Sequence, residues 1–213
     1  MEAGSAGRIR AGAPQACQIA QPDARDRGIS HLTSWAAAPD GHNAGMSMPE
    51  NAGRAFDERP EVLAAWVQLN TAIKEGMDLR RYELATLAAA RRLRSSYCCL
   101  AHGTVLLEQF DEPVLEIALD HRAAGLDEVD VAVMDLAERV VDDATSIGDA
   151  DLQRLRDLGL SETEIMDVVL AAAARCFFSK ALDALGVRAD ASYRDLEPTL
   201  REALVVGRPI ADA

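Results

Sequence analysis

One short segment of the sequence combines residue types that could do thiol chemistry. It reads Ser95-Ser96-Tyr97-Cys98-Cys99-Leu100-Ala101-His102. Cys98 and His102 are four residues apart, so on a helix they share a face and can exchange a proton. If Ser95 caps that helix, Cys98 takes the third helical position, where the positive helix end favours the nucleophilic thiolate. The spacing therefore predicts a nucleophilic Cys98 with His102 as its base.

A third group, Glu83, could orient the His102 imidazole and stabilise its charge. Fifteen residues separate Glu83 from Cys98, which is about 22 Å along a continuous helix. The chain must therefore turn near residues 94–96, or the partner group must come from another subunit. Positive potential around the cysteine is expected from the five arginines of this region, Arg80, Arg81, Arg91, Arg92 and Arg94. From spacing alone, a cysteine that only packs and an arginine face that is only solvated remain alternatives.

The elements that must position these residues are helices, because apolar residues recur at intervals of three, four and seven. The pattern predicts seven of them, at about residues 60–76, 79–94, 97–110, 111–119, 126–141, 149–158 and 161–185. Asp111 is expected to cap the fourth, and Ser161 with Glu164 forms a capping box for the last. The last helix is expected to bury an inward face of Ile165, Val168, Val169, Ala172, Cys176 and Phe177, and Trp66 is likewise assigned to the core. With no convincing strand, the fold class is all-α.

Composition agrees with a helical protein and excludes several partners. Aromatic residues are 4% of the 213 residues and hydrophobic residues 49%, so the apolar content is mostly Ala, Leu and Val. The formal net charge of -13 argues against binding nucleic acid or an anionic membrane. Transmembrane and secretory segments are not recognisable, and four cysteines are too few for a disulfide framework. A cytoplasmic protein is expected.

The chain is expected to divide into three parts. Residues 1–52 are rich in Gly, Ala, Pro, Ser and Asn and are interpreted as a disordered extension, with translation starting at Met46 or Met48 as one hypothesis. Residues 56–193 form the helical domain, and residues 194–213 are a loosely patterned tail. A cofactor is not expected, because the chain has no glycine-rich phosphate loop. A metal is not expected either, because Cys98, Cys99 and His102 on one helix, even with His121, seldom reach tetrahedral geometry.

At Glu83, Tyr97, Cys98 and His102 the chain resembles the carboxymuconolactone decarboxylase/alkyl hydroperoxidase D-like (AhpD-like) family, whose redox branch carries Glu followed by Cys-x-x-Cys-x-x-x-His. The later segment from Phe177 to Val187 is similar to the family's closing helix. The resemblance covers about residues 56–193. It implies an AhpD-like helical domain, a homo-oligomer, and reduction of a small-molecule hydroperoxide with an external thiol as reductant.

The sequence departs from the family pattern at Ser95, which stands where the first, resolving cysteine is expected. Ser95 cannot form the disulfide, although it could donate a hydrogen bond to a Cys98 thiolate. Three outcomes stay open: a one-cysteine peroxidase with Glu83 and His102 relaying protons, resolution by Cys99 through a strained vicinal disulfide, or loss of redox function. The last would leave a non-redox enzyme of the decarboxylase type or an interaction protein. Retention of Cys98 and His102 favours the peroxidase.

Overall fold

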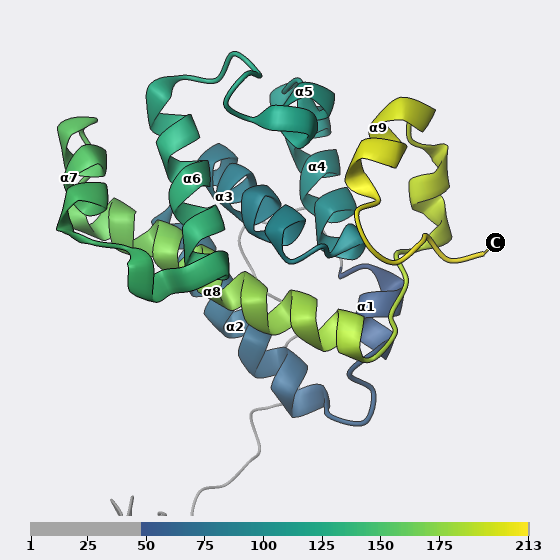
Figure 1. Ribbon diagram of the computed structural model, residues 1–213. Helices are drawn as coiled ribbons and strands as arrows, with labels where there is room; N and C mark the ends of the chain where they lie inside the picture. Colours follow the sequence, from purple (N-terminus) through teal and green to yellow (C-terminus); the bar gives the residue numbers. More distant parts are fainter. Residues whose placement is uncertain (1–47, 213) are drawn as a thin grey trace, which may run out of the picture. The chain divides into compact units, whose positions relative to one another are not determined.

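The computed structural model describes residues 48–212, and all the regular structure within this range is helical (Figure 1). Nine α-helices follow one another, with short 3₁₀ turns at Ala144–Ser146 and Ala191–Asp195. They are α1 (Glu50–Arg54), α2 (Pro60–Gly76), α3 (Leu79–Arg92), α4 (Ser96–Phe110), α5 (Val114–Asp120), α6 (Glu128–Asp143), α7 (Asp149–Asp157), α8 (Glu162–Ala184) and α9 (Pro198–Leu204). The predicted all-α class is confirmed.

Helix α3 lies at the centre of the core and packs against α4, α6 and α8 (Figure 1). Its nine consecutive residues from Tyr82 to Ala90 are all buried. Four of these residues are alanine, and such small side chains let neighbouring helices approach from several sides at once. A polar group on this helix, such as the carboxylate of Glu83, is therefore held deep inside the protein.

The turn between α3 and α4 reverses the chain and brings Glu83 back towards Cys98. Arg94 adopts the left-handed conformation with φ of 57°, and the Ser95 amide donates to the Ala90 carbonyl at 3.0 Å, which ends α3. The C-terminal segment holds this turn in place. The Gly207 amide donates to Ser96 Oγ at 2.8 Å, and Arg94 Nε donates to the Val206 carbonyl at 3.2 Å.

Helix ends follow the predicted caps with one exception. Ser95 takes the N-cap position of α4, although its side chain makes no capping hydrogen bond, and Ser161 and Glu164 form the capping box of α8. Asp111 does not cap α5: it ends α4 in the left-handed conformation with φ of 52°, and Pro113 precedes α5. A short polar side chain such as that of Asp111 tolerates the left-handed conformation better than most side chains do. The aspartate that is expected to start α5 therefore ends α4 instead.

Three expectations about packing differ from the structure. Phe177 is 49% exposed, and Phe178 takes the core position instead, stacked on Trp66 with ring centres 3.9 Å apart. Residues 194–212 are not loosely placed, because α9 packs against α4 and α5 and buries Leu200 and Leu204. The predicted disordered extension, residues 1–52, includes the first three residues of α1, of which Ala52 is fully buried. Residues 1–47, including Met46 and Cys17, lie outside the described residues.

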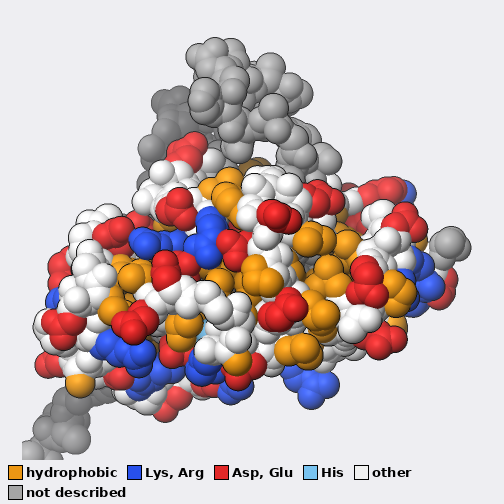
Figure 2. All heavy atoms as spheres, turned by 90° about the horizontal axis from the view of Figure 1, so that it is seen from above, with side chains coloured by type: hydrophobic (Ala, Val, Ile, Leu, Met, Phe, Trp, Pro, Cys, Tyr) orange, Lys and Arg blue, Asp and Glu red, His pale blue; other side chains and the backbone are white. Residues whose placement is uncertain are grey.

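The face seen from above mixes acidic, basic and hydrophobic side chains, and the hydrophobic ones form patches across its middle (Figure 2). That mixed surface agrees with the net charge of -13. In the part of the chain that the structure describes, none of the helices has the length and apolar character needed to span a bilayer.

Candidate active site

Cys98 lies in the first turn of α4, at the third helical position predicted from Ser95. Its side chain is packed in the core, and the residue is only 2% exposed. Its sulfur is within hydrogen-bond distance of two groups from α8: Ser179 Oγ donates to Sγ at 3.1 Å, and Arg175 Nη1 lies 3.8 Å from Sγ. The sulfur is thus surrounded by donors that stabilise a negative charge.

Arg175 is a buried cation, 3% exposed, in the middle of the apolar face of α8. Its Nη2 donates to Tyr82 Oη at 3.1 Å, and the guanidinium lies 5.7 Å from the ring centre of Trp66 and 5.8 Å from that of Phe178. Within residues 48–212 it forms no ion pair with a carboxylate. Despite burial, the pKa of Arg175 lies above its ordinary value, because Tyr82 and Cys98 favour the cation.

A buried charge without a counter-ion is strongly destabilising, by several kcal/mol as an order of magnitude. Two titratable groups contact the Arg175 guanidinium, the Tyr82 hydroxyl at 3.1 Å and the Cys98 thiol at 3.8 Å, and a thiol is ordinarily the stronger acid of the two. The aromatic faces of Trp66 and Phe178 supply further attraction through their π-electrons. The Cys98 sulfur therefore lies against a buried positive charge that no carboxylate of the described residues pairs with.

His102 lies one turn after Cys98 on α4 and pairs with Glu83, while the described residues show no hydrogen bond between His102 and the Cys98 sulfur. His102 Nδ1 lies 2.5 Å from Glu83 Oε2, and Lys74 Nζ from α2 lies 3.2 Å from the other carboxylate oxygen. Although burial opposes its ionisation, the pKa of Glu83 is held below its usual value by His102 and Lys74. Burial, together with the positive charge of Arg175, lowers the pKa of His102 against the pull of Glu83.

This arrangement assigns the proton positions of the pair. An ionised Glu83 accepts the hydrogen bond from His102 Nδ1–H, which leaves Nε2 as the unprotonated nitrogen of a neutral imidazole. A neutral imidazole fixed in this way is the form that removes a proton from a thiol. Glu83 is contributed by the same chain, because the turn at Arg94 folds α3 against α4.

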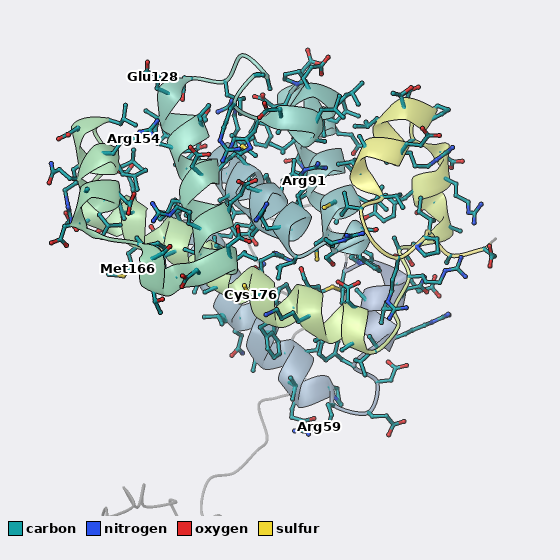
Figure 3. The ribbon with its side chains drawn as sticks, viewed as in Figure 1. Arg59, Arg91, Glu128, Arg154, Met166 and Cys176 are labelled. Carbon is teal, nitrogen blue, oxygen red and sulfur yellow. The ribbon has the colours of Figure 1, made fainter. Side chains whose placement is uncertain are left out.

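The sequence-predicted arginines have other contacts. Arg80 and Arg81 bind Asp130, and Arg92 binds Asp142 at the surface. Arg91 reaches from α3 to the Ala203 carbonyl at 2.9 Å (Figure 3). The guanidinium next to the sulfur is that of Arg175 instead, so the prediction that Arg91, Arg92 and Arg94 supply it differs from the structure.

The other sequence-predicted residues, Ser95, Tyr97 and Cys99, form no hydrogen bond with the Cys98 sulfur. Ser95 is fully buried at the start of α4, but the hydroxyl that donates to Sγ belongs to Ser179. Tyr97 points away to α1 and the C-terminal segment, where its hydroxyl donates to Asp190 and accepts from the Ala52 amide at 3.1 Å. Burial raises the pKa of the Cys99 thiol, which is fully enclosed.

Cys176 follows Arg175 on α8 and is half-buried (Figure 3). Burial also raises the pKa of its thiol. The three cysteines of the described range, Cys98, Cys99 and Cys176, are all free thiols. A half-buried thiol held in the neutral form is a poor nucleophile, so Cys176 does not replace Cys98 as the candidate for thiol chemistry.

A separate group of possible metal ligands lies between α5 and α6. It consists of His121, Asp135 and Glu138, whose ligand atoms are within 4.8 Å of one another. His121 Nε2 is 3.0 Å from Asp135, and Arg122 binds both carboxylates with Nη2. A guanidinium thus already pairs with both carboxylates, and the group is explained as a link between two helices.

Comparison with known proteins gives the fold but not a function. Neither a protein-family model nor a curated protein matches the chain. Among solved structures it is similar to the alkylhydroperoxidase AhpD core of an uncharacterized peroxidase-related protein from Ralstonia eutropha JMP134, with a TM-score of 0.63 and 20% identity over 67% of this chain and 78% of that one. An uncharacterized peroxidase-related protein from Silicibacter sp. TM1040 is equally similar, with a TM-score of 0.63 and 20% identity over 67% and 77%. The chain has the AhpD-like fold.

Proposed function

We propose that this chain, with its AhpD-like fold, belongs to the AhpD-like family and is a thiol-dependent peroxidase that reduces hydroperoxides through Cys98. The contact between the buried Arg175 guanidinium and the Cys98 sulfur carries the proposal. A cation without a carboxylate partner, placed against a thiol at a helix N-terminus, favours the thiolate. Thiolates attack hydroperoxides, whereas thiols do not.

In the proposed reaction His102 Nε2 removes the Cys98 proton, and the thiolate attacks the distal hydroperoxide oxygen. A sulfur–oxygen bond forms as the oxygen–oxygen bond breaks, and the released alkoxide takes the proton from the imidazolium. Cys98 becomes a sulfenic acid, and the hydroperoxide becomes an alcohol or water. Glu83 holds the imidazole and stabilises its transient charge, and Lys74 keeps Glu83 ionised.

The burial of Cys98 restricts the reactants. With 2% of the residue exposed, the sulfur is accessible only to small molecules that pass the surrounding side chains. The reductant that restores the thiol is therefore a small external thiol, available in a reducing cytoplasm. The exposed apolar side chains of Met166, Leu170 and Phe177 on α8 are compatible with the homo-oligomer that the family resemblance implies.

The test compares hydroperoxide consumption in the parent and in Cys98→Ala. Hydrogen peroxide and an organic hydroperoxide are each supplied with excess dithiothreitol, and loss of peroxide is followed. Consumption that depends on Cys98 and persists in Cys176→Ser, the half-buried cysteine on α8, supports the proposal. Equal rates in the parent and in Cys98→Ala would refute it.

A further inference from the structure

Three buried hydrogen-bond donors around Cys98 and Arg175 have no acceptor among the described residues, and one of them is the Ser95 hydroxyl. The other two are Arg175 Nε and the indole nitrogen of Trp66, Nε1, and both side chains are more than nine-tenths buried. The guanidinium lies 5.7 Å from the centre of the Trp66 ring, so both donors border the same buried region. Unsatisfied buried donors are rare and costly, so an acceptor that forms among them is stabilised.

The first step of the proposed reaction supplies such an acceptor. When the oxygen–oxygen bond breaks, one oxygen atom stays on the Cys98 sulfur. The sulfenic acid can lose its proton to the His102 imidazole and become a sulfenate, an anion whose charge rests largely on this oxygen. Arg175 Nη1 already lies 3.8 Å from the sulfur, close enough for its N–H to reach an oxygen bound there. Ser179 Oγ, 3.1 Å from Sγ, adds a second donor.

The usual reaction that removes a sulfenic acid is blocked here. Condensation needs a second thiolate, and Ser95 has none at the position where the family pattern places it. Cys99 is the neighbouring thiol, but burial raises its pKa, and successive helical residues point about 100° apart. With 2% exposure, Cys98 is also shielded from the cysteines of other protein molecules.

We propose that the oxidised protein holds Cys98 as a persistent sulfenate, bound by Arg175 and Ser179 in a buried oxyanion site. The inference rests on the proposed peroxidase function and specifies its oxidised state. It makes Cys98 a reversible modification site, whose lifetime depends on whether a small thiol can enter. Further oxidation to the sulfinic acid is slow, because the ion-paired sulfenate is a weaker nucleophile and a second hydroperoxide must enter the same buried region.

The experiment follows the full-length protein after one equivalent of hydrogen peroxide. Excess peroxide is removed with catalase, and intact mass and dimedone labelling are recorded over several hours. The expected result is a gain of one oxygen atom that persists, reacts with dimedone at Cys98 and disappears on addition of dithiothreitol. Cys98→Ser, in which no such oxygen is added, identifies the site.

Variants test the oxyanion site itself. For this comparison the parent and the variants receive a second equivalent of hydrogen peroxide in place of catalase, because a sulfinic acid needs a further oxidant. In Arg175→Met and Ser179→Ala we expect the lifetime of the one-oxygen species to fall about tenfold or more, with sulfinic acid as the product, because a charge-assisted or buried hydrogen bond is lost. Arg154→Met, which changes an exposed arginine on α7 (Figure 3), should leave the lifetime unchanged. Ser179→Ala also provides the test if Arg175→Met fails to fold.

The outcomes separate the two proposals. No mass change at Cys98 would refute the peroxidase function. Prompt formation of a disulfide or a sulfinic acid in the parent would leave the peroxidase function standing and overturn the persistent sulfenate. A long-lived sulfenate that is equally stable in Arg175→Met and Ser179→Ala would overturn the assigned oxyanion site.

Discussion

Arg175 Nη1 lies 3.8 Å from Cys98 Sγ, although 77 residues separate the two in the chain. The contact joins the first turn of α4 to the middle of α8. It places a permanent positive charge against the thiol inside the core, where water does not screen it. The reactivity of Cys98 is therefore expected to depend on a helix that carries none of the predicted catalytic residues.

Removing this charge should make Cys98 less reactive at neutral pH. In Arg175→Met we expect the rate of alkylation at Cys98 at pH 7 to fall about tenfold or more, since a charge-assisted contact of about 1.5–3 kcal/mol is lost. The measurement is labelling with iodoacetamide, read by mass spectrometry. Arg92→Met, which removes a surface ion pair with Asp142, is the matched control and should keep the parent rate.

The Glu83–His102 pair predicts a particular change in the pH dependence of activity. Glu83→Gln removes a negative charge that raises the pKa of His102, so this pKa should fall further below its usual value. The acid limb of peroxidase activity should then move to lower pH, while the plateau rate falls about 10- to 100-fold because the imidazole is held less well. A lower plateau with an unmoved acid limb would show that His102 is not the titrating base.

The same pair makes the fold sensitive to acid. The pKa of His102 is below its ordinary value of 6.5 in the folded protein, so the unfolded chain binds a proton first as pH falls. Stability contributed by the neutral imidazole is complete above about pH 6.5 and is lost as pH decreases below it. The pKa of Glu83 is also lowered, so protonation of this carboxylate near pH 4 decreases the free energy of unfolding further. The free energy of unfolding in urea, measured from pH 7.5 to 4.5, should decrease less in His102→Asn than in the parent.

The start of the Cys98 helix depends on a glycine in the C-terminal segment. A Cβ on Gly207 would lie 2.0 Å from the Arg94 carbonyl oxygen, so Gly207→Ala must displace the backbone that donates to Ser96 Oγ. We expect a loss of about 2 kcal/mol or more, by analogy with other substitutions that force a backbone shift. Thermal unfolding gives the measurement. Gly148→Ala, where the nearest atom to the added carbon is 4.0 Å away, should change the melting temperature little.

Sequence and structure agree where the signals are local. Pro60 and Gly76 bound α2, and Ser161 with Glu164 starts α8, because caps depend on neighbouring residues. Residue type and spacing are enough to propose Glu83 and His102 as functional residues. Their contact depends on the left-handed turn at Arg94, which the sequence does not signal because the residue is not a glycine.

Arg175 and Ser179 were not predicted, because nothing near them in the chain points to Cys98. One signal was present: between residues 168 and 179, Arg175 is the only charged residue of an otherwise apolar and small-residue run. A lone charge on a buried face requires a partner. The identity of that partner depends on tertiary packing, which the local sequence does not show. The arginines close to Cys98 in sequence do not supply the positive charge at its sulfur, because they bind acidic groups and carbonyls elsewhere.

The Ser95→Cys variant tests whether the site lacks only a resolving thiol. Ser95 is fully buried and three residues before Cys98, and Cβ atoms at this helical spacing are about 5–6 Å apart, slightly wider than a disulfide requires. Because Ser95 is the N-cap, outside the regular helix, a small backbone adjustment can close that gap. One equivalent of peroxide should then remove two thiols instead of one, through a disulfide between the introduced cysteine and Cys98. The dimedone-reactive species should disappear within the mixing time or reach a much lower level.

Ser95→Ala is the matched control, since it removes the same hydroxyl without adding sulfur. It should keep the long-lived sulfenate of the parent, because the donors to that oxygen come from α8. Loss of the sulfenate in both variants would instead assign to Ser95 the stabilising contact that the structure gives to Ser179. If Ser95→Cys loses a single thiol and behaves as the parent, the two sulfurs do not meet, and the serine is not the reason that Cys98 stays unresolved.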